Sequence, residues 1–183
     1  MINKEFLKRL IYEETGSSYS GVEGWIRSMR DISSGKQKEY YTWLHSSLNK
    51  VPVKSYRDSE VLTYHINHLR ERMPSDAYCQ KKGCYDTAYY TSAYIKDINI
   101  HYVEGYVQAM IPIQHAWNYY PDEDIYFDLI NDIAWDGEDS HFTEYYEVIN
   151  VHPKYELPIY TSITGDAGGF LNDPRVIQEI MGW

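Results

Sequence analysis

The apolar residues of this 183-residue chain change their spacing near residue 98, and this change constrains the fold more than any other feature. Up to residue 75 they recur three and four residues apart, as in amphipathic helices. The predicted helices lie around 6–11, 22–29, 40–48 and 61–69. From residue 98 to 110 the apolar residues alternate instead, which predicts a strand.

The rest of the chain adds one helix and three strands to this pattern. A helix is predicted from Cys84 to about Lys96, and strands over 111–119, 125–130 and 142–151. The order of helices, then a central helix, then antiparallel strands is typical of an α+β fold with helices on one side of a sheet. We expect one compact chain made of a helical subdomain, residues 1–76, and a core, residues 77–183.

Turn and cap residues punctuate these elements. Val51-Pro52-Val53 is interpreted as the end of the third helix, because proline cannot continue it. Asp58 is the predicted N-cap of the fourth helix. The proline-led acidic run from 120 to 124 predicts a hairpin turn between two strands. Asp173, followed by proline, predicts a short last helix.

Negative charge is concentrated in the back half of the chain. Up to Gly83 the sequence has 14 lysines and arginines against 10 acidic residues, and after it 3 against 17, for a net charge of −10. Phosphates are repelled by such a surface, so we expect no nucleic-acid partner there. A basic peptide or protein would suit it, although the charge also serves solubility alone.

Several classes of protein are disfavoured by what the sequence lacks. Two cysteines are too few for a disulfide scaffold, and no paired Cys-x-x-Cys pattern indicates a metal, so we expect no cofactor. The start MINKEFLKRL lacks the apolar core of a signal peptide, and no window approaches about 18 apolar residues. We therefore expect a cytoplasmic protein with no membrane contact, whose oligomeric state the sequence does not indicate.

Three short motifs supply a nucleophile, a base and an acid in that order. Lys82-Gly83-Cys84-Tyr85-Asp86 places Cys84 at a helix start, Gln114-His115-Ala116-Trp117-Asn118 places His115 on a strand, and Tyr126-Phe127-Asp128-Leu129 places Asp128 on the next strand. A thiol becomes a good nucleophile when its pKa falls, and the backbone N–H groups of a helix start lower it. An imidazole can then hold the proton while a carboxylate fixes its tautomer.

The hairpin turn brings the base and the acid together. His115 and Asp128 lie seven and six residues from its centre at 122, so adjacent antiparallel strands would make them near partners. Asp124 and Asp132 are the rivals for the role of Asp128.

Other candidates follow from nearness to these motifs in the sequence. The backbone N–H of Cys84 and the side chain of Gln80 are the candidate oxyanion donors. Aromatic residues close to the three motifs are the candidate lining of a substrate cleft. They are Tyr78, Tyr85, Tyr106 and Trp117.

Gly-Cys at a helix start, His-Ala-Trp on a strand and Asp on the next strand together resemble the papain-like and transglutaminase-like cysteine enzymes. The segments Tyr102–Tyr106 and Pro112–Trp117 look most like small transglutaminase-like domains of bacteria and their phages. The resemblance covers about residues 78–130. Gly83 directly precedes Cys84 here, and the residues after Asp128 also depart from the usual pattern of the family.

The resemblance implies a papain-like core preceded by a helical part that the family does not share. It implies that Cys84 is the nucleophile, His115 the base and Asp128 the orienting acid of a thiol-dependent acyl transfer. Hydrolysis of a peptide or other amide is then favoured over crosslinking to an amine.

Plainer interpretations stay open beside this one. Cys84 alone can be a small buried residue, and His115 alone a structural histidine. The rival function is a non-catalytic binding or inhibitor protein, of a kind that a phage could encode, which keeps the fold and sets its acidic, tyrosine-rich back face against a basic partner.

A few further side chains have less favoured interpretations. His65 and His68 are spaced to share a metal with Cys79, and Cys79 could pair with Cys84 as a redox switch. Glu104, on the strand before His115, either contacts the site or faces water.

Overall fold

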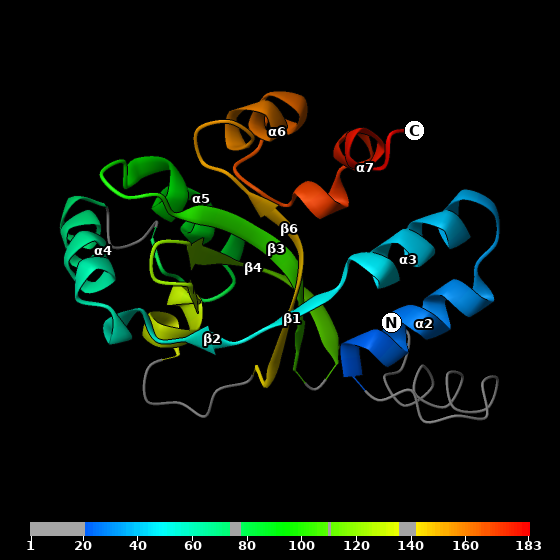
Figure 1. Cartoon of the computed structure of the whole chain (residues 1–183), viewed down its shortest axis with the longest axis horizontal. Coiled ribbons are helices and arrows are strands. Elements are labelled where there is room, and N and C mark those ends of the chain that lie inside the picture. Colours follow the sequence, from blue (N-terminus) through cyan, green and yellow to red (C-terminus); the bar gives the residue numbers. More distant parts are fainter. Residues whose placement is uncertain (1–20, 74–77, 110, 136–141) are drawn as a thin grey trace. The chain divides into compact units, whose positions relative to one another are not determined.

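The computed structural model describes residues 21–73, 78–109, 111–135 and 142–183 (Figure 1). The chain forms two compact units, Met1–Leu48 and Asn49–Trp183. The helix expected around 6–11 lies outside the described residues. The first unit contains two predicted helices, α2 (Gly21–Ile32) and α3 (Gly35–Ser47).

The second unit carries all the strands found in the described residues. Its elements, in chain order, are β1 (Asn49–Val51), β2 (Val53–Lys54), η1 (Tyr56–Asp58), α4 (Glu60–Arg72), α5 (Cys84–Tyr94), β3 (His101–Gln108), β4 (Pro112–Tyr120), β5 (Ile125–Phe127), η2 (Ile130–Ala134), β6 (Glu144–Val151), α6 (Leu157–Thr164), η3 (Phe170–Asn172) and α7 (Pro174–Met181). The elements η1 and η3 are 3₁₀ turns, and η2 is a π-helical turn. The fold is therefore mixed α+β, as predicted.

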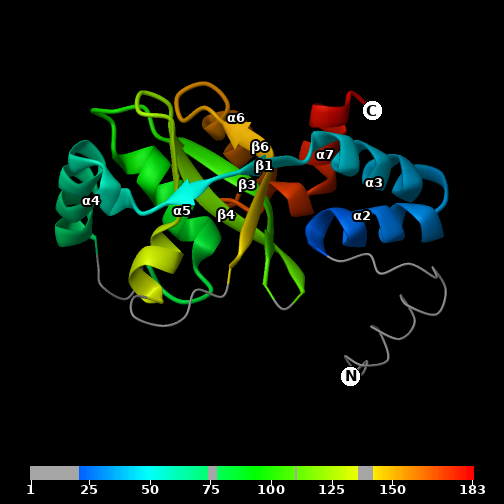
Figure 2. The ribbon, with the colours of Figure 1, turned by 60° about the horizontal axis from the view of Figure 1, so that its bottom comes forward.

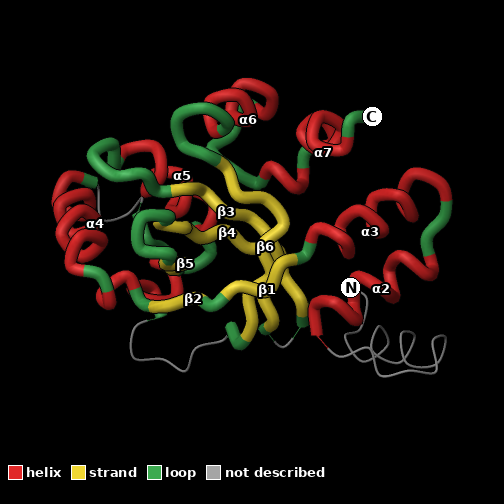
Figure 3. Tube along the Cα trace, viewed as in Figure 1, coloured by secondary structure: helices red, strands yellow, loops and turns green. Residues whose placement is uncertain are grey.

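The six strands form one curled sheet in the order β1-β6-β3-β4-β5-β2 (Figure 3). All neighbours are antiparallel except β2 and β5, which are parallel. The two edge strands, β1 and β2, are separated in sequence by Pro52 alone. Because one short segment pairs with both ends of the strand order, the sheet has to curl toward closure.

This pairing corrects the predicted boundary at residue 76. Val51 and Val53 belong to strands of the sheet and do not merely end a helix. The compact unit therefore begins at Asn49, and α4 belongs with the sheet. The predicted N-cap of α4 is also displaced by one residue. Ser59 caps it, and its hydroxyl accepts the Leu62 N–H at 3.1 Å, whereas Asp58 lies in η1.

Helix α5 packs against β3 and β4 (Figure 2). Asn118 of β4 fixes it, because its side-chain amide donates to the Ala88 carbonyl and to the Ser92 hydroxyl, each at 2.9 Å. The preceding residue, Trp117, lies in a second core with Val103 and Tyr145. The alternation of β4 therefore gives the sheet two buried faces.

The remaining differences from the sequence reading are local. The strand predicted over 125–130 ends at Phe127, and helix α6 was not predicted. Among the described residues, no helix has the length and apolar character needed to cross a membrane.

Candidate active site

Cys84 is the first residue of α5, as predicted, and a tight turn leads into it. The Gly83 N–H donates to the Gln80 carbonyl at 2.9 Å, with Lys82 at a φ of 73° inside the turn. A Cβ on Gly83 would lie 3.2 Å from the Gln80 carbonyl oxygen, so glycine serves close approach here. The half-buried Cys84 thiol sits where the first amides of the helix have no helical acceptor.

His115 lies on β4 opposite Gly105 of β3. A Cβ on Gly105 would come within 1.9 Å of the Tyr146 carbonyl oxygen, so no other residue fits there. The register between β3 and β6 also shifts between Glu104 and Gly105, which bends the sheet beside the imidazole. His115 itself is 3% exposed.

Asp128 follows β5 directly and is the acid that holds His115. Its Oδ2 lies 2.8 Å from Nε2 of His115, and both side chains are buried. Its Oδ1 accepts the backbone N–H groups of Ile130 and Asn131, at 2.9 and 3.3 Å. The start of η2 thus binds the carboxylate from one side and the imidazole binds it from the other.

The imidazole also bonds the thiol. Burial lowers the pKa of His115, but the charge and hydrogen bond of Asp128, together with a hydrogen bond to Cys84, outweigh it and raise the pKa to about 10. Because Nε2 faces Asp128, Nδ1 is the nitrogen left for the sulfur. The thiol and the carboxylate therefore both act on the His115 imidazole, and the three predicted residues lie together.

The rival acids are occupied elsewhere. Asp132 accepts the Tyr56 N–H at 2.9 Å and the Ser55 hydroxyl at 3.1 Å, which ties η2 to η1. Asp124 is exposed and accepts the Tyr119 hydroxyl at 3.0 Å. Neither holds His115.

Two of the predicted cleft aromatics are core residues. Trp117 is 1% exposed and stacks on His115 with ring centroids 6.2 Å apart, so it backs the imidazole and cannot line an open cleft. Tyr78 is 6% exposed, and its hydroxyl bonds Thr91 of α5 at 2.7 Å. It belongs to the core cluster that includes Leu62 and Phe127.

The other two aromatics lie nearer the thiol. Tyr85, next to Cys84, is half-buried, and its hydroxyl bonds the side chain of Asn172. Tyr106 is 4% exposed, and its hydroxyl accepts from Gln114 at 3.1 Å. Tyr85 therefore remains the cleft candidate that the structure leaves partly accessible. The Gln80 side chain is exposed, at the turn before Cys84.

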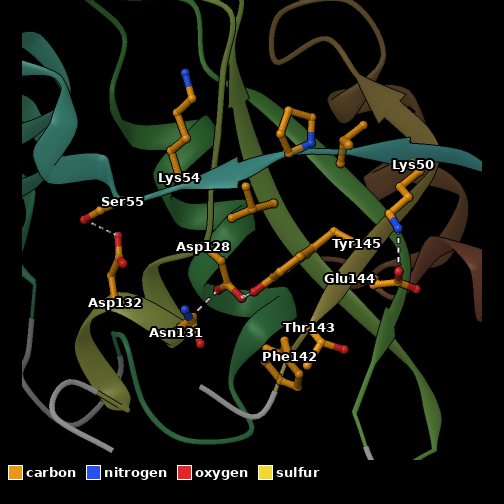
Figure 4. Close-up of a pocket in the computed structure, with 13 residues that line it drawn as sticks. Lys50, Lys54, Ser55, Asp128, Asn131, Asp132, Phe142, Thr143, Glu144 and Tyr145 are labelled. Carbon is orange, nitrogen blue, oxygen red and sulfur yellow. Dashed lines mark hydrogen bonds and ion pairs between the residues drawn. The ribbon is translucent and has the colours of Figure 1, made fainter. Parts of the chain in front are cut away.

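Tyr145, on β6, also belongs to this site, and no sequence pattern indicated it. Its hydroxyl donates to Oδ2 of Asp128 at 2.9 Å. Beside this bond lies a cavity of about 390 Å³, whose lining includes Asp128, Asn131, Phe142 and Tyr145 (Figure 4). Phe142 also packs on His115, with centroids 4.7 Å apart.

The acidic turn does not border this site. Its residues, Asp122, Glu123 and Asp124, are exposed beyond the end of β4. His115 lies five residues before Tyr120, where β4 ends, which is about 17 Å at the rise of a strand. The turn therefore lies too far along β4 to stand at the mouth of the thiol site.

The structure does not support a redox pair of cysteines, a metal site or a solvent-facing Glu104. Cys79 and Cys84 are both free thiols, and Cys79 is buried. Among the described residues, no three His, Cys, Asp or Glu side chains come together as metal ligands would. Glu104 is 1% exposed, so it does not face water.

Comparison of the chain with protein-family models, curated proteins and solved structures gives no match. The side chains of the site and their contacts are therefore the basis for assigning a function.

Proposed function

We propose that this chain is a thiol-dependent acyl-transfer enzyme with a papain-like core, in which Cys84 is the nucleophile. The observation that carries the proposal is the buried His115–Asp128 pair, 2.8 Å apart, beside the Cys84 thiol, which also raises the pKa of the imidazole. The second nitrogen of a buried imidazole also needs a partner. The Asp128 carboxylate meets Nε2 of His115, and Nδ1 is the nitrogen left for the Cys84 thiol.

The reaction starts from a thiolate–imidazolium pair in which His115 already holds the proton of the Cys84 thiol on Nδ1, because the pKa of His115 is raised to about 10. The thiolate attacks the acyl carbonyl, and the resulting oxyanion meets the backbone N–H of Cys84. The intermediate collapses, His115 gives its proton to the departing amine or alcohol, and a thioester remains. Water then attacks the thioester while His115 takes its proton, and the acid leaves with the thiol restored. Asp128 holds the imidazole throughout, without itself taking a proton.

Hydrolysis of an amide or peptide is the form of acyl transfer that we propose, because no second substrate is needed beyond water. We leave the acidic turn out of the proposed substrate site because of its distance from His115.

An activated ester tests the proposal without knowledge of the natural substrate. Mixing the protein with p-nitrophenyl acetate should give a burst of nitrophenolate equal to the protein, and mass spectrometry should find an acetyl group on Cys84. Cys84→Ser and His115→Gln should each lower the rate by about 10²–10⁴-fold.

Cys79 is the internal control. Burial raises the pKa of Cys79 to about 12, so it stays protonated at neutral pH. Iodoacetamide should therefore modify Cys84 in the folded protein and leave Cys79 intact. Folded protein that gives no burst and in which Cys84 is not alkylated would refute the enzyme proposal and leave the binding protein as the better explanation.

A further inference from the structure

The hydroxyl of Tyr145 meets the carboxylate oxygen that also holds the base. Oδ2 of Asp128 accepts from Tyr145 at 2.9 Å and from Nε2 of His115 at 2.8 Å. Oδ1 is already bound by the two backbone amides of η2. All four contacts are buried or nearly so, so the plane of the carboxylate is fixed.

The ring of Tyr145 adds a second restraint. It packs edge-on against Trp117, with centroids 5.3 Å apart, and Trp117 in turn stacks on His115. It also lies 6.1 Å from the ring of Phe142, which covers the other part of the imidazole. Tyr145 therefore touches both the acid and the aromatic walls around the base.

The cavity beside this contact could bring water to Asp128, and the Tyr145 hydroxyl occupies the position that such water would take. Asp128 and Tyr145 both line the cavity of about 390 Å³, and Figure 4 shows their side chains meeting at its edge. Without the hydroxyl, water from the cavity could reach Oδ2 and compete with His115 for it. A carboxylate shared with mobile water would no longer hold one orientation of the imidazole.

We propose that Tyr145 is a positioning residue for the thiol–imidazole pair, acting through Asp128. The role of Tyr145 rests on the proposed function, but the second measurement below tests its contact with Asp128 independently of that function. The hydroxyl keeps Asp128 aimed at Nε2, so that Nδ1 stays on the thiol.

Tyr102 offers a matched control. It is a fully buried tyrosine whose hydroxyl donates to another buried carboxylate, that of Glu104, on β3. Tyr102→Phe removes the same kind of bond as Tyr145→Phe but leaves Asp128 and His115 untouched.

The first measurement is the rate of Cys84 alkylation by iodoacetamide against pH, followed by peptide mass spectrometry. Tyr145→Phe should slow it about tenfold at neutral pH, because a hydrogen bond to a charged group is lost. Tyr102→Phe should change it less than about twofold. Equal rates in wild type and Tyr145→Phe would overturn the proposal.

The second measurement is the downfield proton resonance of the His115 Nε2–H, which needs no reactivity. In Tyr145→Phe its exchange with water should speed up at least about fivefold, whereas Tyr102→Phe should leave it unchanged. This arm reports on positioning even if the ester gives no burst, so failure of the enzyme proposal and failure of this one are distinguishable.

If Tyr145→Phe does not fold, 3-fluorotyrosine at position 145 replaces it, because the ring keeps its place. The fluorinated phenol is a stronger donor, so it should draw charge from Asp128 and move the His115 Nε2–H resonance upfield. A resonance that does not move would count against a positioning role.

Discussion

Two buried carboxylates, Asp128 and Glu104, are held in nearly the same way. Asp128 accepts two successive backbone amides from η2 and the hydroxyl of Tyr145. Glu104 accepts the amides of Phe170 and Leu171, at 2.7 and 2.9 Å, and the hydroxyl of Tyr102. Of the two, Asp128 alone bonds an imidazole, whereas Glu104 also meets the backbone amide of Gly169.

The imidazole makes Asp128 part of a candidate catalytic site, whereas Glu104 only anchors a loop. No cation of the described residues pairs with Glu104, and burial raises its pKa. It fastens the loop after α6 to the sheet, where a Cβ on Gly168 would come within 2.6 Å of the Tyr102 hydroxyl. Asp128 faces His115, and through it a thiol. Backbone amides and a hydroxyl are enough to satisfy a buried carboxylate. Only the imidazole gives it a partner that can exchange a proton with the thiol.

Asp128→Asn should break the comparison most strongly. It leaves His115 buried without its carboxylate, and loss of one partner of a buried pair costs about 3–5 kcal/mol of unfolding free energy. Urea denaturation measures this loss, and the alkylation rate of Cys84 should fall with it. Asp132→Asn, at the next acid of η2, should leave alkylation unchanged. Unchanged stability and alkylation in Asp128→Asn would show that the pair is not coupled.

Glu104→Gln should cost less, about 1–3 kcal/mol, because one acceptor of a backbone amide is lost but no charged partner is stranded. Cys84 alkylation should stay within about twofold of wild type, measured on the folded variant. Alkylation that falls as far as in Asp128→Asn would mean that both carboxylates serve the thiol.

The positions of Asp128 and Tyr145 show how far sequence reasoning reaches. Asp128 follows from counting residues on each side of one hairpin turn, which is local information. Tyr145 enters through the pairing of β6 with β3, where it lies opposite Val107. No local pattern states which of several strands will neighbour β3, so its hydroxyl could not be placed.

The aromatic residues fail for a related reason. Trp117 was placed in the cleft for its nearness to His115 in the sequence. Residues two apart on a strand share a face, so Trp117 follows His115 into the core. The strands β1 and β2 could not be predicted, because three and two residues are too few to show alternation. The α+β class, by contrast, needed only the change of period.

The pH dependence of the unfolding free energy should differ between the two sites, because His115 and Glu104 lose their protons in different pH ranges. The folded pKa of His115 is raised from 6.5 to about 10, so the native state keeps a proton that the unfolded chain has lost. This contribution is fully present below pH 6.5 and is lost as pH rises toward 10, with a slope of up to about 1.4 kcal/mol per pH unit.

The raised pKa of Glu104 also makes the folded state less stable as pH rises, but this loss begins above pH 4.5. Denaturation curves across pH should therefore flatten on the alkaline side in His115→Gln and on the acid side in Glu104→Gln. Alkaline slopes that are identical in wild type and His115→Gln would contradict the ion pair.

The smallest effect is expected at the acidic turn, which has neither the burial of Glu104 nor the contacts of Asp128. We would change Asp122 and Glu123 to lysine and keep Asp124, which has a φ of 53° and accepts the Tyr119 hydroxyl. Exposed substitutions of this kind shift unfolding free energy by less than about 0.5 kcal/mol. The ester burst and Cys84 alkylation should stay within about twofold of wild type, because the turn is about 17 Å from His115.

Asp97→Lys, at another exposed acid, is the matched control for added positive charge. Slower alkylation in Asp122→Lys/Glu123→Lys than in this control would place the turn near the thiol, against the strand geometry. Loss of binding to a basic peptide at an unchanged ester burst would instead assign the turn to partner binding. Such a result would separate the acidic face from the thiol, since one surface could then be altered without the other.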